Sequence, residues 1–131
     1  MQLYLVRHGA TVVNEKGLYQ GWTDAALTET GKRQCELVKE KLSRVKFDTV
    51  ISSPLERAVS SAQIIAGIPR NYIITNEALK EINFGAWEGL SFVRQNRNIQ
   101  QKGGLGVRIG LIADHRRVRI SPYFTSGLWL V

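Results

Sequence analysis

A short run of apolar and aromatic side chains, Leu-Tyr-Leu-Val at residues 3–6, is followed at once by the polar triplet Arg7, His8 and Gly9. A run of this length and composition is typical of a buried strand. The triplet then lies where the strand ends, and ligands of open α/β sheets bind beyond the carboxyl ends of the strands. An imidazole there can act as a nucleophile beside an arginine that neutralises phosphoryl oxygens. Taken alone, the triplet also fits an ordinary polar turn on the surface.

The size and composition of the chain predict one globular domain. With 131 residues, 44% of them hydrophobic and 22% charged, the chain can bury a core and is not of the disordered class. The single cysteine, Cys35, excludes an internal disulfide and is typical of a reducing compartment. No apolar stretch is long enough for a membrane span, and the N-terminus lacks a signal-peptide pattern. We therefore expect a cytoplasmic protein with no membrane partner.

The net charge of +7 is distributed unevenly along the chain. Residues 1–92 carry 11 Lys/Arg against 10 Asp/Glu, whereas residues 93–131 carry 7 Lys/Arg and a single acidic residue, Asp114. The basic tail has no aromatic side chains between its arginines, which argues against binding to nucleic acid. The break predicts a core domain over 1–92 and a divergent basic tail over 93–131, either frame-shifted or poorly ordered.

Signals for helices and strands alternate after a loop at residues 9–26. Helical spacing of apolar residues predicts a helix from Thr28 to about Val45, and short apolar runs predict strands at 49–51 and 72–75. This alternation predicts an α/β fold with three layers, in which helices flank a largely parallel sheet.

A second helix is expected to begin at Ser53, which is a good N-cap residue. Pro54 would occupy the first helical position, and Glu56 would complete a capping box with Ser53. Gly67 is a typical helix end.

Arg57 lies in the first turns of this second helix, shortly after a strand, so we expect it at the same sheet edge as His8. The unpaired N–H groups of a helix N-terminus also attract anions. Two arginines and a helix terminus around an imidazole would make a site of phosphate size. The alternative is that Arg57 forms a surface ion pair with Glu56 or Glu36.

Glu81 is followed by the apolar residues Ile82, Phe84 and Trp87. Packing among them would desolvate the carboxyl group and favour its protonated form, which a general acid needs. The alternative is an ordinary surface glutamate. Glu88 is a second candidate acid, and it can equally anchor a turn.

Metal and cofactor chemistry find no support in the sequence. One cysteine and two distant histidines make no ligand cluster. The glycines fit neither nucleotide-binding pattern. We therefore expect no metal and no cofactor.

The motifs together resemble the histidine phosphatase superfamily, which is also called phosphoglycerate mutase-like. They cover residues 1 to about 92 in the order and spacing of that family. The matching stretches are residues 3–11 with Asn14, residues 20–24, residues 27–31 with Gln34, residues 52–58 with Ala62 and Gln63, and residues 81–89.

The resemblance implies a mechanism and a set of site residues. His8 would carry the phosphoryl group as phosphohistidine, and Glu81 would protonate the leaving oxygen. Arg7 and Arg57 would clamp the phosphoryl oxygens. The positions that match the substrate-binding loop are Asn14, Gln20 and Gly21. The implied partner is a small phosphorylated substrate.

Within the family, residues 84–89 are similar to small phosphatases of the alpha-ribazole phosphatase type, which act in cobalamin synthesis. Phosphoglycerate mutase is the alternative within the family. One departure stands out: the family has a second catalytic histidine after a later strand, in a His-Gly context, and this sequence has no His-Gly pair besides His8-Gly9. Its other histidine, His115, stands between Asp114 and Arg116. A second hypothesis is therefore a truncated, impaired remnant that only binds phosphate.

Overall fold

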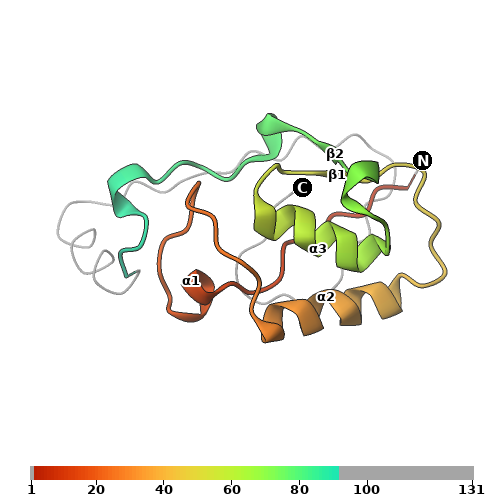
Figure 1. Cartoon of the computed structure of the whole chain (residues 1–131), viewed down its shortest axis with the longest axis horizontal. Helices are drawn as coiled ribbons and strands as arrows, with labels where there is room; N and C mark the ends of the chain where they lie inside the picture. Colours follow the sequence, from red (N-terminus) through yellow and green to blue (C-terminus); the bar gives the residue numbers. More distant parts are fainter. Residues whose placement is uncertain (1, 92–131) are drawn as a thin grey trace.

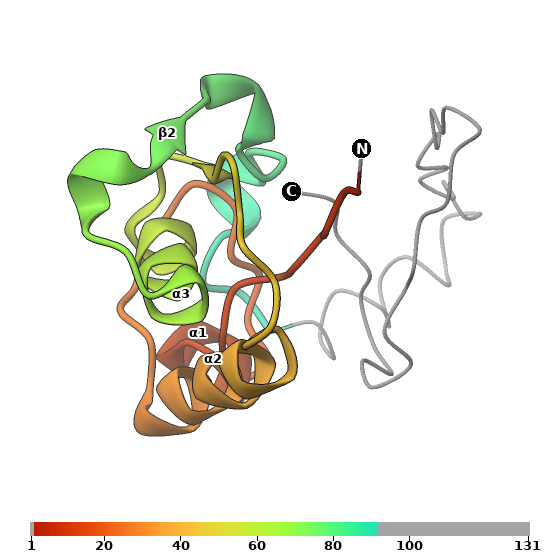
Figure 2. The same cartoon turned by 90° about the vertical axis from the view of Figure 1, so that its right-hand side faces the viewer.

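The fold of the described residues is built from short elements around one small core. A computed structural model of the protein describes residues 2–91. In Figures 1 and 2, α3 lies between α2 and the strand pair. In chain order the elements are α1 (Val12–Glu15), α2 (Glu29–Lys41), β1 (Ile51–Ser52), α3 (Glu56–Ala66), the 3-10 helix η1 (Arg70–Tyr72), β2 (Ile74–Thr75), and the 3-10 helices η2 (Glu77–Leu79) and η3 (Gly85–Trp87).

The two strands run parallel, as the alternation of elements predicted. Ile51 pairs with Ile74 and Ser52 with Thr75. The amide of Ile74 donates to the carbonyl of Val50 over 3.0 Å, which extends the contact beyond β1 itself. Parallel strands need a crossover connection, and α3 lies in the segment that connects β1 to β2. The helix also packs against β1. Both strands are shorter than expected, two residues each.

The prediction of a first strand at residues 3–6 was wrong for this structure, because these residues belong to neither strand. A strand exists only through hydrogen bonds to a neighbour, and the sheet of the described residues consists of β1 and β2 alone. The segment still leads into the core, since Val6 packs against the buried cluster of Leu27, Cys35 and Ile65.

Helix α2 begins where the sequence predicted. The hydroxyl of Thr28 accepts a hydrogen bond from the amide of Gly31 over 3.1 Å and caps the helix. The helix ends at Lys41, earlier than the predicted Val45, whose amide bonds the carbonyl of Leu42 only three residues back. Cys35 is buried on the inner face, as its helical spacing indicated.

The start of helix α3 differs from its prediction. The helix begins at Glu56 rather than near Ser53, and the expected capping box does not form. Glu56 instead pairs with Arg70 and accepts a hydrogen bond from the hydroxyl of Ser60. The end is as predicted, since Gly67 adopts a left-handed conformation with φ of 68°.

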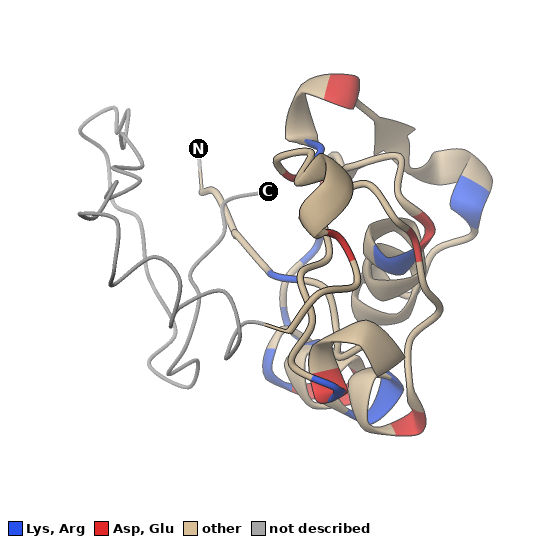
Figure 3. Ribbon diagram, turned by 90° about the vertical axis from the view of Figure 1, so that its left-hand side faces the viewer, with Lys and Arg blue, Asp and Glu red and all other residues tan. Residues whose placement is uncertain are grey.

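Charged residues are interspersed over the described part of the chain, as Figure 3 shows, and do not gather into one basic face. None of its helices is long and apolar enough to cross a membrane. The predicted basic tail at 93–131, the boundary at residue 92 and His115 lie outside the described residues.

Candidate active site

His8 lies in the turn that follows Val6, and its ring is half-buried. Its Nδ1 is 2.7 Å from the carbonyl oxygen of Gly9. Because a carbonyl only accepts, Nδ1 must donate, and the lone pair of a neutral ring is then on Nε2. Burial, together with the positive charges of Arg57 and Arg7, lowers the pKa of His8 to about 4, although the hydrogen bond to Gly9 acts in the opposite direction. The imidazole is therefore neutral at pH 7 and able to act as a nucleophile.

The turn after His8 is held by close backbone contact with helix α2. A Cβ atom at Gly31 would overlap the carbonyl oxygen of Ala10, and one at Gly9 would overlap the carbonyl of Gly31. The amide of Ala10 donates to Oε1 of Gln34 over 3.0 Å, and the amide of Thr28 donates to the carbonyl of Ala10 over 2.9 Å. These contacts fix the backbone beside the imidazole.

Ser61 connects the same turn to helix α3. Its buried hydroxyl accepts a hydrogen bond from the amide of Gly9 over 3.0 Å and donates to the carbonyl of Arg57 over 2.7 Å. Ser61 was not among the residues predicted from the sequence. The available signal was its position four residues after Arg57, which puts both on one helix face.

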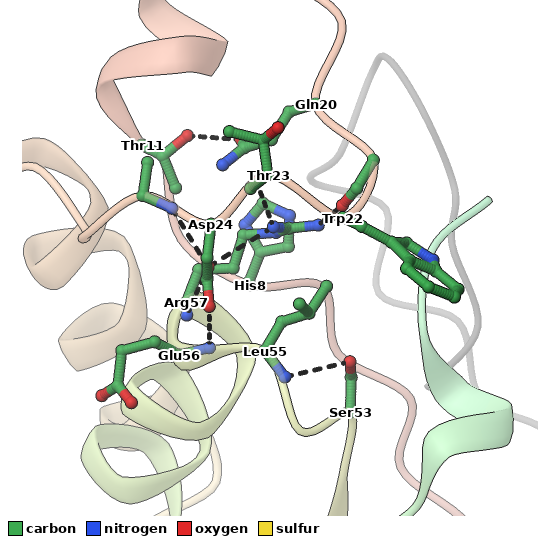
Figure 4. Close-up of polar contacts among 12 residues, drawn as sticks. His8, Thr11, Gln20, Trp22, Thr23, Asp24, Ser53, Leu55, Glu56 and Arg57 are labelled. Carbon is green, nitrogen blue, oxygen red and sulfur yellow. Dashed lines mark hydrogen bonds and ion pairs between the residues drawn. The ribbon is translucent and has the colours of Figure 1, made fainter. Parts of the chain in front are cut away.

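Arg57 is buried at 2% exposure, and its guanidinium is held by the loop at residues 21–24. Its two terminal nitrogens donate to the carbonyls of Gly21 over 2.7 Å and Thr23 over 3.1 Å. Its ionic partner is Asp24 at 3.4 Å, so the alternative pairing with Glu56 or Glu36 does not occur. Burial lowers the pKa of Arg57, and the charge of Asp24 counteracts it. In Figure 4 this guanidinium is drawn across the ring of His8, whose pKa its charge lowers.

Asp24 also caps helix α3, a role that the sequence analysis missed. Its carboxylate accepts hydrogen bonds from the amides of Glu56 and Arg57. The expectation of free N–H groups for an anion at this helix start is therefore wrong for these two amides. The cap lies 32 residues before Glu56 in the chain, so no local pattern reveals it.

Arg7 and Glu81 complete the predicted set of acidic and basic groups. Burial lowers the pKa of Arg7, and the negative charge of Glu81 raises it. Glu81 acts on Arg57 in the same way. Both arginines thus feel the charge of Glu81, and both act in turn on the pKa of His8.

The apolar surroundings predicted for Glu81 are only partly present. Ile82 and Trp87 are exposed at 49% and 46%, so they do not enclose the carboxyl group. Oε1 of Glu81 accepts a hydrogen bond from the amide of Ile82 over 2.8 Å, and the backbone carbonyl of Glu81 accepts one from the indole of Trp22.

The predicted substrate-loop residues Asn14 and Gln20 bond to each other. Asn14 Oδ1 accepts from the amide of Thr11, which leaves its Nδ2 to donate to Gln20 Oε1 over 3.1 Å. The hydroxyl of Thr11 donates to the same Oε1 over 2.6 Å. Gln20 is 8% exposed, and its Nε2 has no hydrogen-bond partner among the described residues. A buried donor of this kind is costly unless an acceptor arrives.

Two roles were predicted for Glu88 from the sequence, a catalytic acid and the anchor of a turn, and its contacts are those of a turn anchor. Its carboxylate accepts hydrogen bonds from the amides of Trp22 and Thr23 over 2.8 and 2.6 Å.

Comparison with known proteins identifies a family. The sequence model of the histidine phosphatase superfamily (branch 1) matches residues 3–104. The chain is 42% identical over 94 residues to a 2,3-bisphosphoglycerate-dependent phosphoglycerate mutase of Cytophaga hutchinsonii, covering 68% of this chain and 43% of that protein.

Two solved structures have similar folds. A phosphoserine phosphatase of Entamoeba histolytica, in complex with 3-phosphoglyceric acid, has 41% identity and a TM-score of 0.62, covering 72% of this chain and 47% of that one. An alpha-ribazole phosphatase of Shigella flexneri has 34% identity and a TM-score of 0.62, covering 75% and 46%. The likeness confirms the predicted α/β fold class. The chain spans less than half the length of each of these relatives.

Proposed function

The chain belongs to the histidine phosphatase superfamily, and on this basis we propose that it hydrolyses a phosphomonoester through a phosphohistidine at His8. One observation carries the proposal. The ring of His8 is neutral, with Nδ1–H committed to the Gly9 carbonyl and Nε2 left with its lone pair, in the field of two guanidinium groups. A neutral nucleophile beside two cations suits attack on a dianionic phosphoryl group.

In the proposed first step, Nε2 of His8 attacks phosphorus, and the bond from phosphorus to the ester oxygen breaks. The leaving oxygen takes its proton from the carboxyl group of Glu81. In the second step, a water molecule attacks the phosphohistidine and gives its proton to the Glu81 carboxylate, while the phosphorus–nitrogen bond breaks. Arg7 and Arg57 neutralise the phosphoryl oxygens in both steps.

The side-chain amide of Gln20 offers a donor that has no partner among the described residues and that suits a phosphoryl ligand. Its Oε1 is committed to Thr11 and Asn14, so the amide orientation is fixed and Nε2 is the donor left over. A phosphoryl oxygen is the acceptor that would satisfy it. Asn14 then acts by orienting Gln20, whereas Gly21 contributes its carbonyl to Arg57.

The substrate class is a small phosphorylated metabolite. Alpha-ribazole phosphate is one candidate, supported by residues 84–89 and by the similar phosphatase of Shigella flexneri. Phosphoserine and phosphoglycerate are the others, because similar proteins carry those names.

A second candidate is phosphate binding with little turnover. It is favoured by the absence, apart from His8-Gly9, of a second His-Gly pair in these 131 residues, whose only other histidine is His115. Loss of one donor to the developing charge lowers a rate by about 100- to 1000-fold. We therefore expect a turnover number well below the common enzyme range of roughly 1–1000 per second.

The test is to incubate the chain with each candidate phosphomonoester, quench in alkali, and locate the phosphorylated peptide by mass spectrometry. We expect phosphohistidine on the peptide that contains His8, and none in His8→Ala. The matched control is His115→Ala, which should keep both the label and the turnover. Equal turnover in His8→Ala and the parent would rule out the proposed mechanism.

A further inference from the structure

Glu88 holds together two loops that meet beside Arg57. One carboxylate oxygen accepts hydrogen bonds from the amides of Trp22 over 2.8 Å and Phe84 over 3.2 Å. The other oxygen accepts from the amide of Thr23 over 2.6 Å. The carboxylate therefore fixes two consecutive amides of the loop at residues 21–24 against the segment that contains Glu88.

The same loop supplies the acceptors for the guanidinium of Arg57. Thr23 donates its amide hydrogen to Glu88 and accepts from Arg57 through its carbonyl oxygen, 3.1 Å away. Gly21, on the other side of Trp22, accepts from Arg57 over 2.7 Å. A Cβ atom at Gly21 would overlap Oε1 of Glu88, so the loop lies directly on the carboxylate. Glu88 and Arg57 are thus connected through the backbone of a single residue, Thr23.

We propose that Glu88 is a positioning residue, which aims the guanidinium of Arg57 at the phosphoryl group by fixing the backbone of residues 21–23. The inference rests on the proposed phosphoryl transfer at His8. It assigns to Glu88 no contact with the substrate and no proton transfer.

The ionised carboxyl group is the form that this role needs, because three amides donate to it. Burial raises the pKa of Glu88, but the hydrogen bonds from Thr23, Trp22 and Phe84 outweigh it and hold the pKa below the usual value. An isosteric amide cannot replace it. In Glu88→Gln, the side-chain NH₂ group would face at least one backbone N–H, so a donor would meet a donor.

The first experiment measures Arg57 directly, without a ligand. The purified chain is treated with phenylglyoxal, and modification of Arg57 is followed by peptide mass spectrometry. In the parent it should be slow, because the side chain is 2% exposed and bonded to two carbonyls. Glu88→Gln should raise the rate about tenfold, as expected for loss of one charge-assisted hydrogen bond.

The matched control is Glu29→Gln, the same change at a side chain that is 88% exposed on α2. It should leave the modification rate of Arg57 unchanged. Glu88→Asp is the second variant, since its shorter side chain keeps the charge but cannot reach both loop amides. Equal rates in Glu88→Gln and Glu29→Gln would overturn the proposal. Loss of cooperative melting in both Glu88 variants would also overturn it, because Glu88 would then support the whole fold.

The second experiment measures the dissociation constant for inorganic phosphate by calorimetry. Introduced into the parent chain, Glu88→Gln should weaken phosphate binding about tenfold. Introduced into Arg57→Ala, it should have no further effect, because the effects of mutations at two coupled residues are not additive. Equal weakening in both backgrounds would contradict an action through Arg57. If the parent binds no phosphate, the proposed function fails, whereas the phenylglyoxal rates still decide whether Glu88 positions Arg57.

Discussion

The amide of Gly9 and the hydroxyl of Ser61 are joined by a buried hydrogen bond of 3.0 Å, although 52 residues separate them in the chain. The same hydroxyl donates to the carbonyl of Arg57. Ser61 therefore sets the position of the His8 turn relative to α3, the helix that carries Arg57.

Ser61→Ala should lower the free energy of unfolding by about 1–3 kcal/mol, because it leaves the buried amide of Gly9 without an acceptor. Urea denaturation measures this. Ser60→Ala is the matched control on the same helix, where the hydroxyl bonds Glu56 at the surface, and it should change stability by less than about 0.5 kcal/mol. Equal losses in the two variants would contradict the connecting role of Ser61.

Asp24→Ala should lower stability by about 0.5–2 kcal/mol through loss of the cap on α3. It also removes the ionic partner of Arg57, so phosphate binding should weaken in the same variant. Thermal melts and calorimetry measure the two effects. Asp48→Ala, at an exposed position, is the control. An unchanged melting temperature in Asp24→Ala would show that the cap contributes nothing.

The low pKa of His8 makes stability depend on pH. Because the folded pKa of about 4 lies below the ordinary value of 6.5, the folded chain binds fewer protons than the unfolded chain between these values. Stability should therefore rise with pH across this window and lose a contribution of the order of 3 kcal/mol as the pH falls through it. His8→Gln should remove most of that slope in urea unfolding at pH 4.5, 5.5 and 7. An identical slope in the variant would contradict a buried neutral ring.

Gly31→Ala should destabilise the chain even though alanine is the better helix former by about 1 kcal/mol. The added methyl group would overlap the carbonyl of Ala10 and push α2 away from the His8 turn. Thr30→Ala, one residue earlier and exposed, is the control and should be neutral or stabilising. A stabilised Gly31→Ala variant would show that the close contact is not required.

Local signals predicted the parts of the fold that local contacts decide. Thr28 caps its own helix through Gly31, three residues away, so the start of α2 could be predicted from the sequence. The cap of α3 comes from Asp24, 32 residues earlier in the chain. A strand at residues 3–6 would likewise need a partner strand from elsewhere in the chain. Neither feature can therefore be predicted from adjacent residues.

The same distinction applies to the candidate site. His8, Arg7, Arg57 and Glu81 were proposed from strand order and from the family resemblance. Asp24 and Glu88 act on the site through backbone groups of distant segments, and such contacts leave no spacing pattern. Ser61 shares a helix face with Arg57, but its bond to the amide of Gly9 spans 52 residues and leaves no local pattern either.

The two carbonyls that hold Arg57 have a thermodynamic consequence. A free arginine side chain gives up about 2 kcal/mol of rotamer entropy when it is fixed on an anion. Here that entropy is lost when the chain folds, since Gly21 and Thr23 already immobilise the guanidinium before any anion arrives. Anion capture by this site should accordingly show a smaller unfavourable entropy than capture by a mobile surface arginine.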